Sequence, residues 1–93
     1  SKRSGENLFI EVQRILESLG MEIIDSDLDS LRLEAVATSF WFGFKDDVLV
    51  QIREYEDASL AEIRSVSRVG VSDLGANAAR IYRILDELEK IDA

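Results

Sequence analysis

The fold is decided by the stretch Leu31-Arg32-Leu33-Glu34-Ala35-Val36-Ala37-Thr38. Its odd positions are all apolar and its even positions are mostly polar, which is the period of two that places side chains on opposite faces of a β-strand. The same alternation recurs over residues 48–53 and 61–66, and a short apolar run lies at 21–24. Polar segments at 25–30, 43–47 and 54–59 separate these runs. The sequence therefore predicts four antiparallel strands joined by short turns.

Apolar residues at helical spacing flank this sheet on both sides. Over 6–19 they recur every three or four residues and Gly20 follows, where a left-handed cap is expected. Over 73–91 a second apolar stripe runs through Ile81 and Ile84. Two one-faced helices and a one-faced sheet bury their apolar sides together only when both helices pack on the same face. We expect an α+β fold of order αββββα, with residues 1–5 as a flexible arm and 6–93 as a single domain.

Composition excludes several classes of function. The 93 residues contain no Cys and no His, which removes disulfides, thiolate nucleophiles, imidazole bases and ordinary zinc sites. With 19 acidic and 11 basic residues the net charge is −8, the wrong sign for binding a nucleic-acid backbone. No apolar run approaches the about 20 residues that a membrane-spanning helix needs. We therefore expect no nucleic-acid partner and no transmembrane segment.

Three acidic or glycine-containing motifs resemble ligand sites only in part. Asp25, Asp27 and Asp29 alternate as in a calcium loop. However, Ser30 stands where such a loop requires Gly, and Val36 stands where it requires a bidentate Glu. The Gly70 to Gly75 spacing matches a phosphate loop, but no Lys or Ser/Thr follows it. Neighbouring Asp46 and Asp47 in an extended segment point to opposite sides, so they do not flank one substrate bond. We predict no metal, no cofactor and no catalytic set.

An aromatic cluster occupies residues 40–44. In an extended chain its three Phe side chains share one side, which favours the core, and Trp41 takes the other. Trp41 is therefore the candidate anchor for a protein partner, and a Trp lying on its own sheet is the alternative.

The most informative segment runs from Arg64 to Ile81. On a helical wheel Asn77 falls inside the apolar stripe, with Asp73 and Arg80 along its edge, so Asn77 must be held by hydrogen bonds. In one interpretation these residues and Arg68 brace the last strand against the helix. In the other, Arg64, Arg68 and Arg80 surround the glycine-rich turn and form an anion pocket.

The segment Arg-Ser-Val-Ser-Arg-Val-Gly-Val-Ser-Asp-Leu-Gly-Ala-Asn-Ala-Ala-Arg-Ile, residues 64–81, resembles the C-terminal signature of the domain-of-unknown-function 1499 family. The aromatic residue and paired Asp at 44–48 resemble that family's second recurrent element. The family carries no established activity, so the resemblance implies a fold and a candidate site but no reaction. The matching positions are Asp46, Asp47, Arg64, Ser65, Ser67, Arg68, Gly70, Ser72, Asp73, Gly75, Asn77 and Arg80. Ala78 and Ala79 depart from the basic residues that often follow the Asn.

Three functions remain open at this stage. The first is a non-enzymatic accessory or interaction domain of a larger assembly, membrane-associated or photosynthetic, with an unidentified protein partner. The second is a domain that binds a small ligand or anion through the Arg64 to Arg80 motif. The third is a hydrolase or isomerase that uses Asp46, Asp47 or Asp73. The resemblance implies a bacterial or plastid source, and processing or trimming would explain a chain that begins at Ser1.

Overall fold

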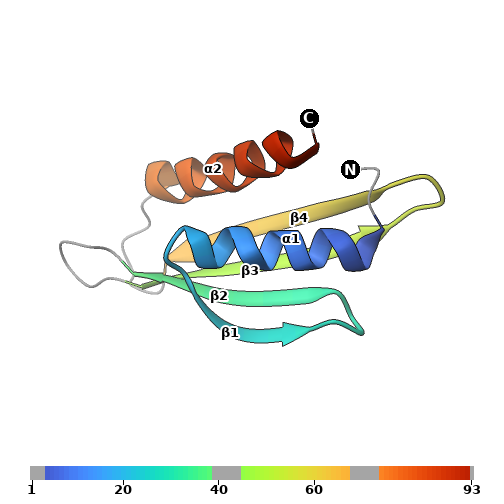
Figure 1. Cartoon of the computed structure of the whole chain (residues 1–93). Helices are drawn as coiled ribbons and strands as arrows, with labels where there is room; N and C mark the ends of the chain where they lie inside the picture. Colours follow the sequence, from blue (N-terminus) through green and yellow to red (C-terminus); the bar gives the residue numbers. More distant parts are fainter. Residues whose placement is uncertain (1–3, 39–44, 68–73, 93) are drawn as a thin grey trace.

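The computed structural model describes residues 4–38, 45–67 and 74–92. Six elements follow one another along them (Figure 1). They are α1 (Gly5–Ser18), β1 (Glu22–Asp27), β2 (Arg32–Thr38), β3 (Lys45–Glu54), β4 (Ser59–Ser67) and α2 (Leu74–Asp92). All four strands form one antiparallel sheet in the order β1-β2-β3-β4. The α+β class and the order αββββα predicted from the sequence are confirmed.

Local signals define the ends of α1. The Ser4 hydroxyl accepts a hydrogen bond of 3.2 Å from the Asn7 N–H, which satisfies one of the free amides of the first turn. Beyond the last turn Gly20 adopts φ +84°, a left-handed conformation that glycine takes without a Cβ penalty. Within the described ranges no helix combines the length and the apolarity needed to cross a bilayer.

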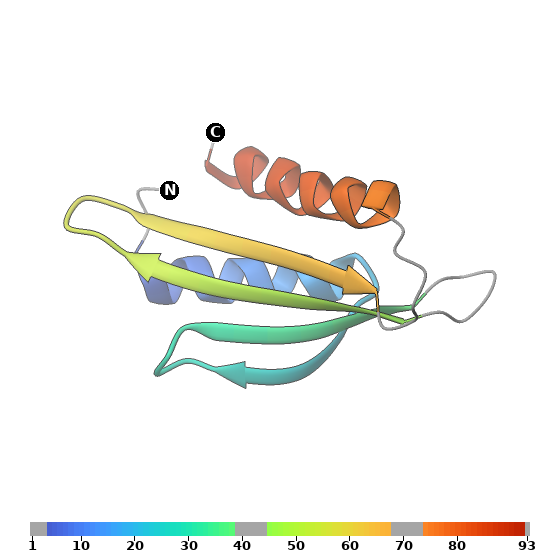
Figure 2. The ribbon, with the colours of Figure 1, turned by 180° about the vertical axis from the view of Figure 1, so that it is seen from behind.

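A single core forms between the sheet and the two helices. It includes Val12 and Leu16 of α1, Val48 of β3 and Ile84 of α2, none of which exposes any measurable side-chain surface. Helix α1 contacts all four strands, while α2 packs on β4 and on α1. Seen from behind, the strands lie in front of α1 and neither helix crosses them (Figure 2). Both helices therefore cover the same face, as predicted.

The opposite sheet face, which we call the open face, carries charged side chains. Arg32 pairs with Glu34 at 3.2 Å and Arg53 with Glu62 at 2.7 Å, and all four are substantially exposed. Such mixed-sign pairing is typical of a solvated antiparallel surface. Alternation along the strands is the reason that apolar residues face the helices and charged residues face solvent.

Strand boundaries differ from the sequence prediction most clearly in β1 and β3, and Glu54 and Ser59, expected in a turn, also pair as strand residues. The strand expected over 21–24 spans Glu22–Asp27, because residues 25–27, expected in a turn, pair with β2 after a register shift between Ile23 and Asp25. Because of this irregularity, and because β1 is an exposed edge strand, its sequence does not show the regular alternation of apolar and polar residues. Strand β3 begins at Lys45 rather than at Val48, since Asp46 and Asp47 pair with β2 and β4 as strand residues.

Candidate functional site

Strand register brings three polar residues onto the helix-covered face at one end of the sheet. Asp46 of β3 pairs with Ser67 of β4, and Val48 pairs with Ser65. Val48 is fully buried beneath the helices, and side chains two residues apart share a face. Asp46, Ser65 and Ser67 therefore point toward the first turns of α2.

Asn77 of α2 meets the two serines. The residue is 6% exposed, and its Nδ2 donates to Ser67 Oγ at 3.0 Å. Its Oδ1 accepts from Ser65 Oγ at 2.5 Å. A buried amide without partners costs about 1 to 3 kcal/mol, so these bonds allow an amide inside an apolar stripe. Asn77 therefore has the hydrogen-bond partners that its place in the apolar stripe requires, and Ser65 and Ser67 of β4 are among them.

Arg80, one turn further along α2, completes the group. Its Nη1 lies 2.9 Å from Ser65 Oγ, 3.0 Å from Asn77 Oδ1 and 3.0 Å from Asp46 Oδ2. The side chains of Arg80 and Asp46 are only 19% and 16% exposed, so this ion pair is largely removed from water. We call Asp46, Ser65, Ser67, Asn77 and Arg80 the polar cluster. It connects β3, β4 and α2 through side chains alone.

Two of the predicted site residues lie away from the polar cluster. Arg64 pairs with Leu49 across β3 and β4 and is exposed on the open face. Asp47 lines a hollow on that same face together with Arg32 and Glu34. Strand alternation sends neighbours to opposite faces, so the expectation that Arg64 and Arg80 share one site does not agree with the structure. Asp46 and Asp47 point to opposite sides, as the sequence predicts.

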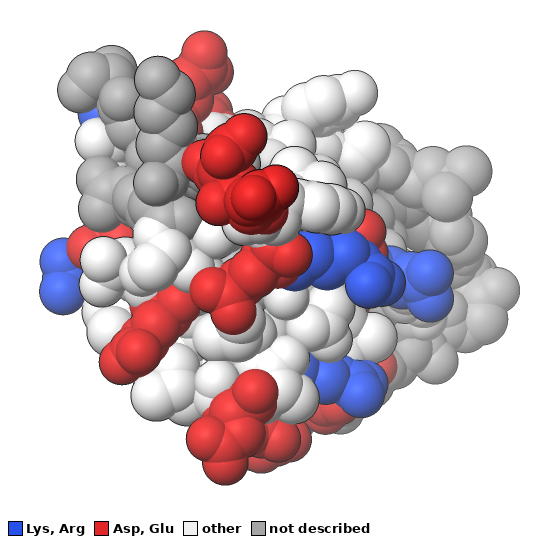
Figure 3. Space-filling model, turned by 90° about the vertical axis from the view of Figure 1, so that its right-hand side faces the viewer, with Lys and Arg blue, Asp and Glu red and all other residues white. Residues whose placement is uncertain are grey.

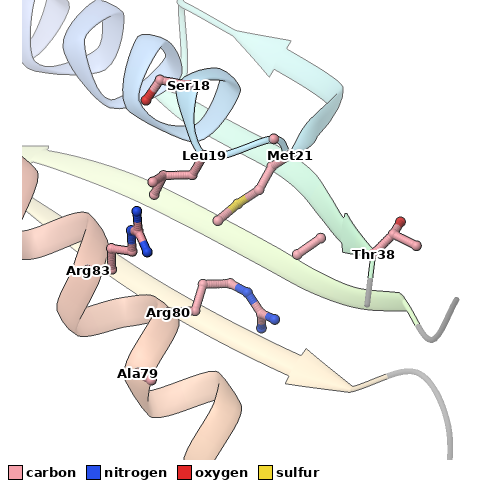
Figure 4. Close-up of a pocket in the computed structure, with 9 residues that line it drawn as sticks. Ser18, Leu19, Met21, Thr38, Ala79, Arg80 and Arg83 are labelled. Carbon is pink, nitrogen blue, oxygen red and sulfur yellow. The ribbon is translucent and has the colours of Figure 1, made fainter. Parts of the chain in front are cut away.

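A pocket of about 440 Å³ opens beside the polar cluster (Figure 4). In Figure 4 Arg83 extends from α2 toward Leu19, while Arg80 extends along β4, with Met21 above it and Thr38 at the end of β2. We call it the arginine pocket. Its described lining consists of Ser18, Leu19, Gly20, Met21, Ala37, Thr38, Ala79, Arg80 and Arg83.

The signature segment identified in the sequence thus supplies four of the five residues of the polar cluster and contributes Ala79 and Arg80 to the lining of the arginine pocket. A family model described as "Protein of unknown function (DUF1499)" matches residues 2–88. The chain belongs to the DUF1499 family. A comparison with curated proteins found no match.

Part of the DUF1499 signature lies outside the described residues. Gly75 falls in the first turn of α2. The signature positions Arg68, Gly70, Ser72 and Asp73 lie outside the described ranges, and so does Trp41 of the aromatic cluster. The roles expected of them, a partner anchor and the rim of an anion pocket, stay predictions.

The sequence analysis missed the residues that complete the arginine pocket. Arg83 stands three residues after Arg80, a spacing that places both on one side of a helix, and this signal was present in the sequence. Leu19, Met21 and Thr38 carried no such signal, because only tertiary packing, in which α1 contacts both β2 and α2, brings them to the site. Among the described residues no group of three acidic side chains gathers as a metal site would require.

Proposed function

We propose that this DUF1499 protein is a binding domain rather than an enzyme, and that it holds a small organic anion in the arginine pocket. One observation carries the proposal: two arginines and no acidic residue are found among the nine described residues that line this pocket. The chain as a whole has 19 acidic residues against 11 basic ones, so the local charge opposes the overall charge.

The chemistry of the lining supports an anion of modest size. Guanidinium groups bind carboxylates and phosphates through paired, charge-assisted hydrogen bonds. Ser18 and Thr38 add hydroxyl groups at the same pocket. Small-molecule sites typically enclose about 300 to 1,000 Å³, and the arginine pocket at about 440 Å³ falls within that range.

Non-enzymatic function is supported by the way the chain uses its polar groups. The carboxylate of Asp46 is engaged by Arg80, and the hydroxyls of Ser65 and Ser67 are engaged by Asn77. The chain has no His or Cys to activate a nucleophile. These bonds favour a structural role for the polar cluster, which holds Arg80 in place at the pocket.

Thermal unfolding in the presence of anions tests the proposal. Acetate or phosphate should raise the melting temperature above that in sodium chloride of equal ionic strength, because a ligand that binds only the folded state stabilises it. Matching the ionic strength is essential, since salt alone screens the repulsion of a chain with net charge −8. No excess shift over chloride for any organic or inorganic anion would contradict the proposal.

A matched pair of variants locates the site. Arg83→Gln removes an exposed positive charge at the arginine pocket, and Arg64→Gln removes an exposed positive charge on the open face. We expect Arg83→Gln to abolish the anion-dependent shift and Arg64→Gln to keep it. The reverse result would place anion binding on the open face and refute the arginine pocket.

A second candidate is the accessory or interaction domain expected from the sequence, in a bacterial or plastid assembly. The observation that favours it is the exposure of Ile24, Leu60 and Val66, at 54%, 49% and 51%, on or beside the open face. Val66→Lys should disrupt a native complex seen by size exclusion of an extract, while Ile10→Lys on α1 should not. Elution only as a free monomer would count against this role.

A further inference from the structure

We infer that the ligand of the arginine pocket is a small monocarboxylate with a short apolar tail. This inference rests on the proposed function and adds to it the charge and the shape of the molecule bound. Two independent features of the described lining lead to it, namely the charge left uncompensated by the polar cluster and the apolar residues that stand opposite the arginines.

Charge compensation within the polar cluster argues for a single negative charge on the ligand. Arg80 is already paired with Asp46, whose Oδ2 lies 3.0 Å from Nη1, and the same nitrogen faces Ser65 and Asn77. Arg83 makes no ion pair with any residue in the described ranges and is exposed at the pocket. The lining therefore presents one uncompensated positive charge, and a monoanion neutralises it without adding a second, unpaired negative charge to the pocket.

The opposite wall of the pocket is apolar. Leu19, Met21 and Ala37 line it, and Ala79 contributes a methyl group from α2. Met21 and Ala37 are otherwise buried, at 7% and 8% exposure, so the surface they retain is small and adjoins the core. An inorganic anion would leave this apolar wall in contact with water, whereas an aliphatic tail would cover it. A carboxylate at Arg83 with a tail toward Leu19 and Met21 matches both walls (Figure 4).

Four probe compounds separate the charge requirement from the apolar requirement. Hexanoate has both features, acetate has the charge alone, 1-hexanol has the chain alone, and adipate has the same chain length with two charges. Binding is followed by ¹⁵N-¹H NMR titration of the full chain, at constant ionic strength. We expect hexanoate to bind at least about tenfold more tightly than acetate, hexanol or adipate. The perturbed amides should be those of residues 18–21, 37–38 and 79–83.

Ala79 and Ala78 provide variants that leave the arginines intact. Both are exposed on α2, but only Ala79 is among the residues that line the pocket. Ala79→Glu places a carboxylate one helical turn before Arg83, where an i, i+4 ion pair occupies the guanidinium in place of the ligand. We expect this variant to weaken hexanoate binding about tenfold or more and Ala78→Glu, with the same change in net charge, to weaken it about twofold or less.

Each outcome of the titration decides one part of the inference. Equal binding of acetate and hexanoate would overturn the apolar tail while the proposed function stands. Tighter binding of adipate than hexanoate would overturn the single charge and again leave the proposed function intact. Equal binding of hexanol and hexanoate, or binding of no probe, would overturn the proposed function and this inference with it. Equal weakening by Ala79→Glu and Ala78→Glu would show long-range repulsion instead of a site.

Discussion

At the scale of single residues, Asn77 and Arg80 show how much helical periodicity reveals. The wheel places Asn77 inside the apolar stripe of α2, and the residue is 6% exposed. Its inward position follows from sequence spacing, because 3.6 residues per turn orient every side chain of the helix. Its hydrogen bonds to Ser65 and Ser67 depend on how α2 packs on β4. The spacing of residues within α2 carries no information about that packing.

The Asp46–Arg80 ion pair should contribute measurably to stability. A double-mutant cycle with Asp46→Asn and Arg80→Gln, measured by urea unfolding, should give a coupling energy above the about 1 kcal/mol of exposed pairs. Removing one partner of a fully buried pair costs about 3 to 5 kcal/mol, and partial exposure reduces this cost. The Arg53–Glu62 pair serves as the comparison, since its side chains are 56% and 48% exposed and its N–O distance is only 2.7 Å. A larger coupling for Arg53–Glu62 would contradict the importance of burial.

At the scale of elements, the β1–β2 turn is organised by one carboxylate. Asp27 Oδ1 accepts from the N–H groups of Asp29 at 3.1 Å and Ser30 at 3.4 Å. This self-capping geometry satisfies turn amides locally, which is why Asp is common at such positions. It also gives the alternating acidic residues of this segment a structural role.

The turn should be sensitive to acid. Hydrogen bonds from the Ser30 hydroxyl, then from the Ser30 and Asp29 backbone, hold the pKa of Asp27 below its ordinary value of 3.8. The pKa is lowered by folding, so the stabilisation is complete above the unfolded value and is lost as pH falls through the folded value. NMR titration of the side-chain carboxyl carbon should give a midpoint below 3.8, and Ser30→Ala should raise that midpoint. An unchanged midpoint in Ser30→Ala would show that the hydroxyl is not the cause.

Helix α2 packs on the core through one face, so substitutions at neighbouring positions should differ sharply in their effect on the free energy of unfolding. Ile84 is fully buried, while Leu85 is 41% exposed. Ile84→Ala should cost about 2 to 5 kcal/mol of unfolding free energy, since it removes core contacts and leaves a cavity. Leu85→Ala should cost less than about 1 kcal/mol. Equal losses in urea unfolding would mean that α2 packs in a different rotation.

At the scale of the whole molecule, negative charge is unevenly distributed. The β1–β2 and β3–β4 turns and the start of α1 lie at one end, and Figure 3 shows acidic side chains gathered there. Exposed members of this group are Glu6, Asp27, Asp29, Glu54, Glu56 and Asp57. Like charges on one surface repel one another and destabilise the folded state, and dissolved salt screens that repulsion.

Salt should therefore stabilise the fold. Raising sodium chloride from about 10 mM to about 500 mM should raise the urea midpoint, because the Debye length falls well below the spacing of the charges. The double variant Glu56→Gln with Asp57→Asn should show a weaker salt dependence than the double variant Glu17→Gln with Glu22→Gln, whose exposed positions lie elsewhere. A midpoint that falls with salt would contradict net repulsion.

The amino-acid pattern alone was sufficient for the fold class, the element order and the face that the helices cover, because periods of 2 and 3.6 orient side chains without long-range information. Composition alone likewise removed disulfides, thiolate and imidazole chemistry from consideration. The register shift in β1 and the early start of β3 depend on pairing with neighbouring strands, so local patterning missed them. The site was decided by tertiary packing: alternation turned Arg64 to the open face, while the packing of α1 on both β2 and α2 placed Met21, Thr38 and Arg83 around one pocket. Contacts between residues this far apart in sequence arise only when the core closes.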